Sequence, residues 1–496
     1  MKTIVLGPPG TGKTTTLLNE VDKYLKQTDP DKIGYFSFTK KASDTARDRA
    51  MSKFNLSEDD LPYFRTLHSL AFKRLGIKKE DVMQRRHYED LGKKTGYNLD
   101  YHEYDNEHTG LFTTKSDLLR ITQMAKLRGI TPERQYNLKQ HTQDITVKQL
   151  KQFVYDLKQY KKDFGMIDFA DMIYDFVKSD KSPKFDVVFI DEAQDLSLSQ
   201  WDMARSIWDK TQDTYIAGDD DQAIFRWAGA DIDSFITQTG RLMKLTQSHR
   251  VPQVVHDIAM NIVSKIQHRL PKEWKPKTQK GLLSYYDDFE QVNMKKGNWL
   301  VLARTRFMLD DLEDYIYSQG LYYQNKYKTN KEQDLYDAIS DWENVRKGVS
   351  INYDQIERIA SYMSQNHFEK KALKHMSKDA NYDMAGLRER TWLKTDKVWF
   401  EAFDDAPSKK IRYIKRMREN GEKLNSGPRI VLSTIHGVKG GEQDNVVLLT
   451  DLSRNTQKNY EQNPDDENRL FYVGATRTKN HLHIIRPKDN YKGYKI

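Results

Sequence analysis

Met1-Lys2-Thr3-Ile4-Val5-Leu6-Gly7-Pro8-Pro9-Gly10-Thr11-Gly12-Lys13-Thr14 opens the chain, and this stretch decides the fold. A short apolar run leads into the pattern G-x-x-x-x-G-K-T, and an apolar helical pattern follows it. Glycines let such a loop turn tightly and bring its N–H groups up to a triphosphate, while the next helix adds a favourable dipole. The stretch therefore predicts a strand, a phosphate-binding loop and a helix.

Two side chains of this loop carry chemistry. We expect Lys13 to reach the β- and γ-phosphates of ATP and Thr14 to ligate Mg²⁺. A chance match to the pattern is the alternative, but the flanking strand and helix favour nucleotide binding. The residues predicted to bind the nucleotide here are Gly7, Pro8, Pro9, Gly10, Thr11, Gly12, Lys13, Thr14 and Thr15.

The composition narrows the class of protein. The 496 residues include 81 Lys and Arg against 72 Asp and Glu, a formal charge of +9 that is compatible with a nucleic-acid partner. There is no Cys, which excludes disulfides, Cys-ligated zinc and iron–sulfur clusters. No apolar run approaches the roughly 20 residues of a membrane span, and a strand occupies the place of a secretory signal. We therefore expect a cytoplasmic protein without membrane contact.

Short apolar strands recur along the chain and end in acids, glycine or a helix start, as buried parallel strands do at a ligand-binding edge. We expect strands at 33–39, 185–192, 214–219, 299–304, 430–433, 446–449 and 481–485, a strand end leading into a helix at 64–70, and a helix at 308–320. Two charged stretches, 77–165 and 326–425, have helical patterns without clear strands. The sequence predicts an α/β fold with two parallel-sheet cores, each interrupted by a helical insertion.

Two acids follow one of these strands. Asp191 can hold Mg²⁺, and Glu192 can orient and deprotonate the attacking water. Paired acids after a strand are common on solvated loops, but beside a phosphate loop they predict a hydrolytic site. The segment 218–230 is more specific, because an acid cluster, a Gln and a Phe-Arg-Trp run rarely adjoin. In it, Gln222 can sense the γ-phosphate and Trp227 can offer a face to a base.

Taken in order, these motifs resemble the UvrD/Rep/PcrA group of superfamily 1 (SF1A) DNA helicases. The resemblance spans the chain to about Ile485, and the motifs that carry it are G-x-x-G-x-G-K-T, F-T-K-K-A, T-L-H-S, D-E-A-Q-D, G-D-D-D-Q-x-I-F-R-W-x-G-A, S-H-R, T-I-H-G-V-K-G-x-E and Y-V-G-A-T-R. It implies two RecA-like domains with ATP in the cleft between them, an inserted helical subdomain in each, and 3′ to 5′ movement on single-stranded DNA. The implied boundaries are 1–76 and 166–250 for the first domain, 77–165 for its insertion, 251–325 and 426–496 for the second domain, and 326–425 for its insertion.

The resemblance also implies roles for single residues. Arg250 and Arg477 resemble the two arginine fingers of the family, Glu442 matches the acid that contacts the ribose, and the roles of Lys13, Thr14, Asp191, Glu192 and Gln222 agree with those argued above. The residues at positions that contact DNA in the family are Phe38, Thr39, Thr66, His68, Trp227, Thr434 and His436. For a single Arg the alternative is a surface ion pair, and for Phe38 or Trp227 it is core packing.

Several positions depart from the family pattern. The family reads adenine with a Gln some twenty residues before the phosphate loop, and we expect that segment to be missing here. His249 stands where a Tyr usually stacks on adenine, and Ala228 replaces a usual Arg. Gly441 and Gln443 replace apolar or aromatic residues beside Glu442. Base recognition is therefore the least defined part of the site. The helical insertions are short for the family, which favours a minimal motor such as a virus could encode.

The leading interpretation is an ATP-dependent DNA helicase or translocase that uses ATP and Mg²⁺ and acts, as a monomer, on single-stranded DNA and single/double-strand junctions, with replication or repair proteins as further partners. An ATP-gated single-strand clamp that remodels protein–DNA complexes without unwinding is the alternative. A small-molecule kinase with a phosphate loop is a third reading, but it does not explain a second α/β core with its own Arg finger.

Overall fold

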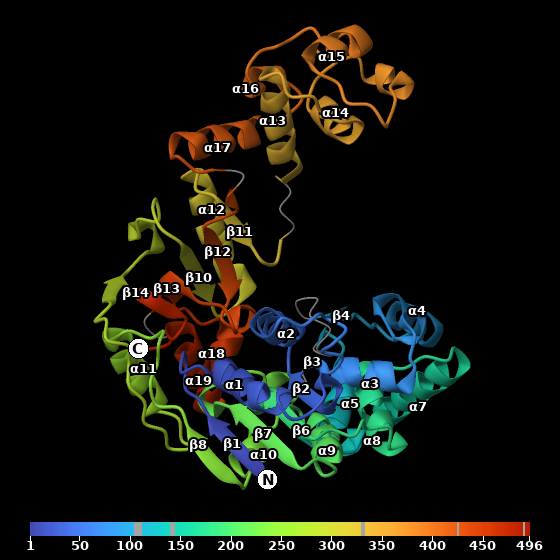
Figure 1. The fold of residues 1–496 in the computed structure, drawn as a ribbon, viewed down its shortest axis with the longest axis vertical. Coiled ribbons are helices and arrows are strands. Elements are labelled where there is room, and N and C mark those ends of the chain that lie inside the picture. The colour runs from blue at the N-terminus through green and yellow to red at the C-terminus, as the bar shows by residue number, and fades with distance from the viewer. Residues whose placement is uncertain (104–111, 139–143, 329–332, 424–425, 490–491) are drawn as a thin grey trace.

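The computed structural model describes residues 1–103, 112–138, 144–328, 333–423, 426–489 and 492–496. Two six-stranded parallel sheets form its body, and a group of helices extends from the second sheet as an arm (Figure 1). The predicted α/β class, with two parallel-sheet cores and helical insertions, is confirmed.

The first sheet has the strand order β3-β2-β6-β7-β1-β8, and all neighbouring strands are parallel. Its strands are β1 (Lys2–Leu6), β2 (Ile33–Ser37), β3 (Phe64–Thr66), β6 (Val187–Asp191), β7 (Asp213–Gly218) and β8 (Arg241–Lys244). Because parallel strands end at one edge of a sheet, the loops after β1, β2, β6 and β7 gather there.

Helices cover both faces of this sheet. They are α1 (Lys13–Leu25), α2 (Lys40–Phe54), α3 (Leu67–Leu75), α8 (Phe169–Ser179), α9 (Leu198–Trp208) and α10 (Ile232–Ile236). On one face, Leu17 of α1 and Ala46 of α2 pack in one buried cluster with Phe189 of the sheet. The apolar face of α1 thus holds its N-terminus, and with it the phosphate loop, at the edge where the strands end.

A small helical subdomain is inserted between α3 and α8. Its elements are α4 (Arg85–Thr95), β4 (His102–Glu103), β5 (Phe112–Thr113), α5 (Asp117–Leu127), α6 (Pro132–Asn137) and α7 (Val147–Asp163). Leu119, Leu150 and Phe153 belong to its separate core. At the start of α7, Thr146 and Gln149 form a capping box that satisfies two free N–H groups.

The second sheet has the order β11-β12-β10-β13-β14-β9, again with parallel neighbours. Its strands are β9 (Leu282–Tyr286), β10 (Trp299–Ala303), β11 (Tyr323–Asn325), β12 (Ile430–Thr434), β13 (Gln443–Leu449) and β14 (Thr478–Ile485). The helices packed with it are α11 (Gln253–Val263), α12 (Asp310–Ser318), α18 (Arg454–Gln462) and α19 (Pro464–Ala475).

The arm leaves the second sheet after β11 and returns before β12. It contains α13 (Gln333–Arg346), α14 (Tyr353–Ala360), α15 (Met384–Thr391), α16 (Trp399–Ala402) and α17 (Ser408–Glu419). Trp342, Trp399 and Phe403 are buried in a core of its own. In Figure 1 the arm stands at the top, away from the first sheet.

Some elements differ from the sequence prediction. Strands β8, β9 and β11 were not expected, and β8 is largely exposed, so its residues lack the apolar run that marks a buried strand. Strand β2 ends at Ser37 because Thr39 caps α2 instead: its Oγ accepts the N–H of Ala42 at 3.1 Å. Among the described residues, no helix has both the length and the apolar character needed to cross a bilayer.

Candidate functional site between the two sheets

The phosphate loop joins β1 to α1. Gly10 (φ 72°) and Gly12 (φ 82°) adopt the left-handed conformation that favours glycine. A Cβ on Gly7 would lie 2.1 Å from the Lys13 Cγ, so this glycine leaves room for the lysine. Lys13 Nζ donates to the Gly7 carbonyl at 2.9 Å and lies 3.8 Å from Glu192 Oε1. The lysine thus spans the loop and faces the acid predicted to activate water.

Hard oxygen atoms lie beside the loop. Thr14 Oγ1 donates to Asp191 Oδ2 at 2.9 Å, and the Tyr35 hydroxyl donates to the same oxygen at 2.8 Å. Burial, and then the charge of Glu192, raise the pKa of Asp191. A hydroxyl and a carboxylate this close are the donor set that Mg²⁺ prefers, so Thr14 and Asp191 fit the predicted metal site.

Glu192 has an unusual backbone and a strongly ionised side chain. Its φ of 54° is uncommon for a residue other than glycine, and its N–H donates to Asp191 Oδ1 at 2.9 Å. Burial alone would raise the pKa of Glu192, but Lys13 and Lys439, with a 2.6 Å hydrogen bond from Gln194, lower it to about 2. The carboxylate is therefore charged at neutral pH and can orient a water molecule.

Arg477, near the C-terminus, reaches the first half of the chain. Its Nη2 donates to Gln222 Oε1 at 3.0 Å, and its Nε donates to the Val473 carbonyl at 3.0 Å. Gln222 is held in turn, since its amide donates to Asp219 Oδ2 at 2.7 Å. Burial, and then the neighbouring Arg250, lower the pKa of Arg477 to about 9. The structure thus brings two residues of the predicted site together across the two halves.

Arg250 and His249 lie on the other side of the phosphate loop. The His249 N–H donates to the Gly10 carbonyl at 2.8 Å, while its side chain is exposed. A Cβ on Gly10 would lie 2.4 Å from Arg250 Cβ, so the loop and this arginine pack closely. Arg250 forms an ion pair with Glu442 of the second half. One predicted finger, Arg250, therefore packs on the loop and is paired with the predicted ribose-contacting acid.

Lys439 is a residue of this site that sequence reasoning missed. Its ammonium group is hydrogen-bonded to Asp195 Oδ2 and donates to the Gln222 carbonyl at 2.7 Å. Asp195 is 2% exposed, and burial raises its pKa to about 7 although Lys439 opposes the shift. Both residues lie inside motifs of the resemblance, but they are 244 positions apart and no spacing links them.

A buried charge cluster fastens the loop after β7 to the second half. Lys272 Nζ lies 3.1 Å from Asp219 Oδ1 and 3.0 Å from Asp221 Oδ2, and it also pairs with Asp220. Arg269 binds both oxygens of Asp221 at 2.7 Å. Bidentate pairs of this kind fix orientation as well as charge, so the loop that carries Gln222 has little freedom.

Just after this loop in the sequence, aromatic rings of the first half contact a ring of the second half. The ring of Trp227 lies 5.9 Å from that of His436, edge to face, and both adjoin Phe225 at 6.5 and 6.2 Å. Phe38 packs on Phe225 at 5.5 Å and is only 4% exposed, whereas Trp227 is 43% exposed. Of these predicted DNA contacts, Trp227 presents an open ring, and Phe38 lies within the core.

The other predicted DNA contacts lie at strand ends. Thr39 and Thr66 cap α2 and α3 at the carboxyl edge of the first sheet. His68 is 4% exposed beside the ring of Phe169, and burial lowers its pKa to about 4. Thr434 ends β12 in the second sheet. The structure places these four at the same sheet edges as Trp227, but no contact joins His68 to the aromatic group.

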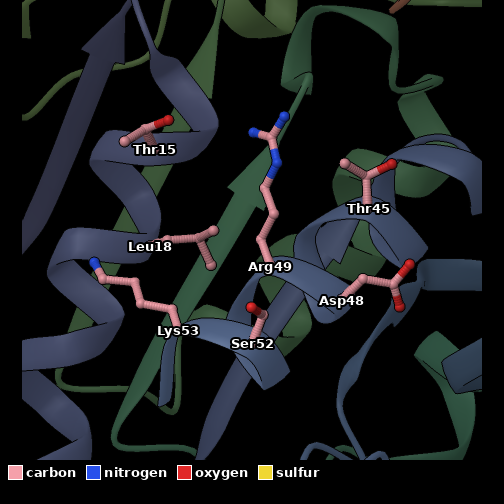
Figure 2. A pocket seen from close by; sticks show the side chains of 7 residues that line it. All are labelled: Thr15, Leu18, Thr45, Asp48, Arg49, Ser52 and Lys53. Atoms are coloured by element: carbon pink, nitrogen blue, oxygen red, sulfur yellow. The ribbon is translucent and has the colours of Figure 1, made fainter. Parts of the chain in front are cut away.

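One residue predicted to bind the nucleotide, Thr15, lies beside a hollow between two helices. Thr15 lines a hollow of about 620 Å³ between α1 and α2, together with Leu18 and, across the groove, Arg49 (Figure 2). Three further predicted residues form the turn between β1 and α1: Pro8, Pro9 and Thr11.

Comparisons with known proteins agree with this geometry. The model of the UvrD/REP helicase N-terminal domain matches residues 1–242, and that of the UvrD-like helicase C-terminal domain matches residues 429–485. The first match contains the phosphate loop, Asp191, Glu192 and Gln222. The second contains Lys439, Glu442 and Arg477. Together the two models cover most of the residues described above at the nucleotide site.

Curated relatives point the same way. The chain is 20% identical to DNA helicase II of Rickettsia typhi, over 99% of this chain and 91% of that protein. It is 23% identical to the ATP-dependent DNA helicase PcrA of Bacillus subtilis and 24% identical to the ATP-dependent DNA helicase Rep of Buchnera aphidicola. These two matches span 57% and 54% of this chain but only 40% and 44% of the relatives. With both family models and these relatives in agreement, the chain belongs to the UvrD-like group of superfamily 1 helicases, an ATP-dependent family of DNA helicases.

Proposed function

We propose that the protein moves 3′ to 5′ along single-stranded DNA and couples ATP hydrolysis between its two sheets to the separation of duplex DNA. The single observation that best supports this is the hydrogen bond between Arg477 and Gln222, because it joins the two halves beside Lys13 and Glu192. The ring contact of Trp227 with His436 joins the same two halves. A movement of the two halves at the nucleotide site would therefore also alter the contact between the rings of Trp227 and His436.

The residues of the nucleotide site suggest a division of labour. Lys13 binds the β- and γ-phosphates, and Glu192, ionised at neutral pH, orients the attacking water and takes its proton. Gln222 contacts the γ-phosphate, while Arg250 and Arg477 neutralise charge that develops in the transition state. Mg²⁺, held by Thr14 and Asp191, would add positive charge at the phosphate oxygens. Glu442 would contact the ribose and His249 the base.

The DNA path follows from the same arrangement. We propose that the strand runs along the carboxyl edges of the two sheets, past Thr39, Thr66 and His68 on the first half and Thr434 on the second. Trp227 would stack on a base, which tolerates any sequence because every base has a flat face. We further propose domain boundaries at 76, 165, 250, 325 and 425, and that the protein acts as a monomer at single/double-strand junctions.

One experiment tests the proposal. Duplexes with a 3′ or a 5′ single-stranded tail are incubated with the protein, Mg²⁺ and ATP, and strand separation is measured. Unwinding of the 3′-tailed duplex alone is expected, and Lys13→Ala should abolish it. Unwinding of the 5′-tailed duplex alone contradicts the direction. Displacement of streptavidin from a biotinylated strand without any unwinding would instead support the clamp that only remodels protein–DNA complexes.

A further inference from the structure

The second sheet carries an exposed aromatic ring, that of Phe307, which is 60% exposed. It belongs to a short 3-10 turn, η7 (Arg306–Leu309), directly after β10. Leu309 is fully buried in the core of the second sheet, and Met308 packs against that core. Met308 and Leu309 therefore anchor the turn, while most of the Phe307 side chain is exposed.

The register of the sheet sets the position of this turn. Strands β10 and β12 pair so that Ala303 lies opposite Thr434, and the Ile435 N–H donates to the Ala303 carbonyl at 3.0 Å. The turn with Phe307 thus lies beside the loop that carries Thr434 and His436. This is the edge of the second sheet at which the proposed strand of DNA would pass.

A tyrosine joins the turn to that loop. The Tyr327 hydroxyl lies 2.7 Å from Thr434 Oγ1, and the guanidinium of Arg306 lies over the Tyr327 ring at 4.1 Å. Lys326 Nζ donates to the Gly437 carbonyl at 2.6 Å. Two cations therefore lie beside the loop of Thr434 and His436, and positive charge there suits a phosphate backbone.

The first half presents a matching feature. Trp227 is 43% exposed and contacts His436, whose loop adjoins the turn of Phe307. The edge thus has one open ring on the first half and one on the second. Single exposed apolar residues are ordinary on protein surfaces, so exposure alone would mean nothing. The fixed turn, the adjoining cations and the position beside Thr434 distinguish Phe307.

We propose that Phe307 is a second stacking platform, which binds an unpaired nucleobase on the second half of the protein. The proposal rests on the proposed function, since it presumes that single-stranded DNA follows these edges. With Trp227 and Phe307 on different halves, a base is held on each side while the halves move. Stacking requires no particular base, as movement along arbitrary DNA demands.

Titration with single-stranded DNA tests the role of the ring. The DNA concentration that half-maximally stimulates ATP hydrolysis should rise about 5- to 150-fold in Phe307→Ala, as loss of one stacked base predicts. Phe307→Tyr should remain within about twofold of the wild type. Leu282→Ala is a matched control, because Leu282 is a 56% exposed apolar residue at the opposite, amino edge of the same sheet. A Phe307→Ala protein that matches the wild type overturns the proposal.

Photocrosslinking tests the contact in the unaltered protein. A thymidine oligomer with scattered 5-iododeoxyuridine is irradiated on the wild type, and the crosslinked peptides are sequenced by mass spectrometry. A crosslink at Phe307 is expected, and crosslinks at Trp227 without any at Phe307 overturn the proposal. If single-stranded DNA fails to stimulate ATP hydrolysis by the wild type at all, the proposed function itself is wrong.

Discussion

The two halves of the molecule meet in two regions of different chemistry. Beside the phosphate loop, buried ionic and amide groups form directed hydrogen bonds, as between Arg477 and Gln222 or Lys439 and Asp195. Where the DNA is proposed to pass, the contact between the two halves is that of the exposed Trp227 ring with the less exposed His436 ring. Directed hydrogen bonds can recognise one particular ligand, whereas an aromatic ring can stack on any base. Small changes in the nucleotide region should therefore alter mainly the rate of ATP hydrolysis. Changes in the ring region should alter mainly the affinity for DNA.

The largest effect is expected from the phosphate loop and the catalytic acid. Lys13→Ala removes the phosphate clamp and should abolish ATP hydrolysis. Glu192→Gln should keep ATP binding but lower kcat by about 10²- to 10⁴-fold, the usual contribution of a general base. Steady-state hydrolysis and equilibrium binding of a fluorescent ATP analogue measure the two effects. Near wild-type hydrolysis by Glu192→Gln would show that another group activates the water.

Arg477→Ala tests whether the second half completes the nucleotide site. A finger that stabilises the transition state contributes about 10³ to 10⁵ in rate, so kcat should fall far more than ATP binding weakens. Hydrolysis at saturating ATP, with binding measured in parallel, separates the two. Arg486→Ala is a suitable control, because Arg486 pairs with Asp287 on the surface of the same sheet. Equal losses of rate and affinity would argue against closure of the second half on ATP.

Trp227→Ala should affect the ring region instead. Loss of one stacked base costs about 1–3 kcal/mol, so single-strand affinity should fall about 5- to 150-fold, equally for poly-dT and mixed sequences. Fluorescence anisotropy of labelled strands measures this. Aggregation together with loss of DNA-independent hydrolysis would identify Trp227 as a structural residue, which its exposure argues against.

The buried pair of Asp195 and Lys439 predicts a pH effect. Burial raises the pKa of Asp195 to about 7 from an unfolded value near 4, so the folded state favours the protonated acid. That stabilisation is complete below pH about 4 and is lost as the pH rises to about 7. The free energy of unfolding of the wild type, relative to Asp195→Asn, should therefore fall by at least about 1 kcal/mol across this window. Parallel stability curves for the two proteins would contradict the assignment.

The smallest effect concerns the base. His249 offers a smaller ring than Tyr for stacking on adenine, and its side chain is exposed. The proposed contacts with the phosphates do not depend on which base the nucleotide carries. GTP should therefore support DNA-stimulated hydrolysis with kcat/KM within about tenfold of ATP, or roughly 1.4 kcal/mol. His249→Tyr should widen the preference for ATP. Discrimination beyond about a hundredfold against GTP would mean that another side chain, such as Thr16 or Asn19, reads the adenine edge.

Contiguous motifs made much of this molecule predictable. That Lys13, Thr14, Asp191 and Glu192 lie close together could be predicted from the sequence because a strand, a loop and a helix fix them locally, while their chemical roles stay predictions. The buried strands were found because apolar runs mark them, while the exposed edge strand β8 was not. Arg477 entered through the resemblance alone, since no local pattern distinguishes it from a surface arginine.

Long-range pairs could not be predicted in the same way. The ammonium of Lys439 and the carboxylate of Asp195 meet only because two separate sheets pack together, and Lys272 meets three acids for the same reason. The exposure of Phe307 could not be predicted from the sequence either, because a single Phe after a strand is usually part of a core. Spacing within one element is local, but such contacts depend on tertiary packing.

The arm with its own core has a consequence for cooperativity. Its buried tryptophans, Trp342 and Trp399, pack among arm residues, and its contacts with the body include α17 against the end of α12, where Tyr413 stacks on Tyr317. Sub-global opening tends to follow such boundaries, because few interactions outside the unit are lost when it opens. The arm should exchange its amide hydrogens as one unit, ahead of the two sheets. Heat or denaturant would then melt the arm while Arg477 is still hydrogen-bonded to Gln222 and Lys13 still lies beside Glu192.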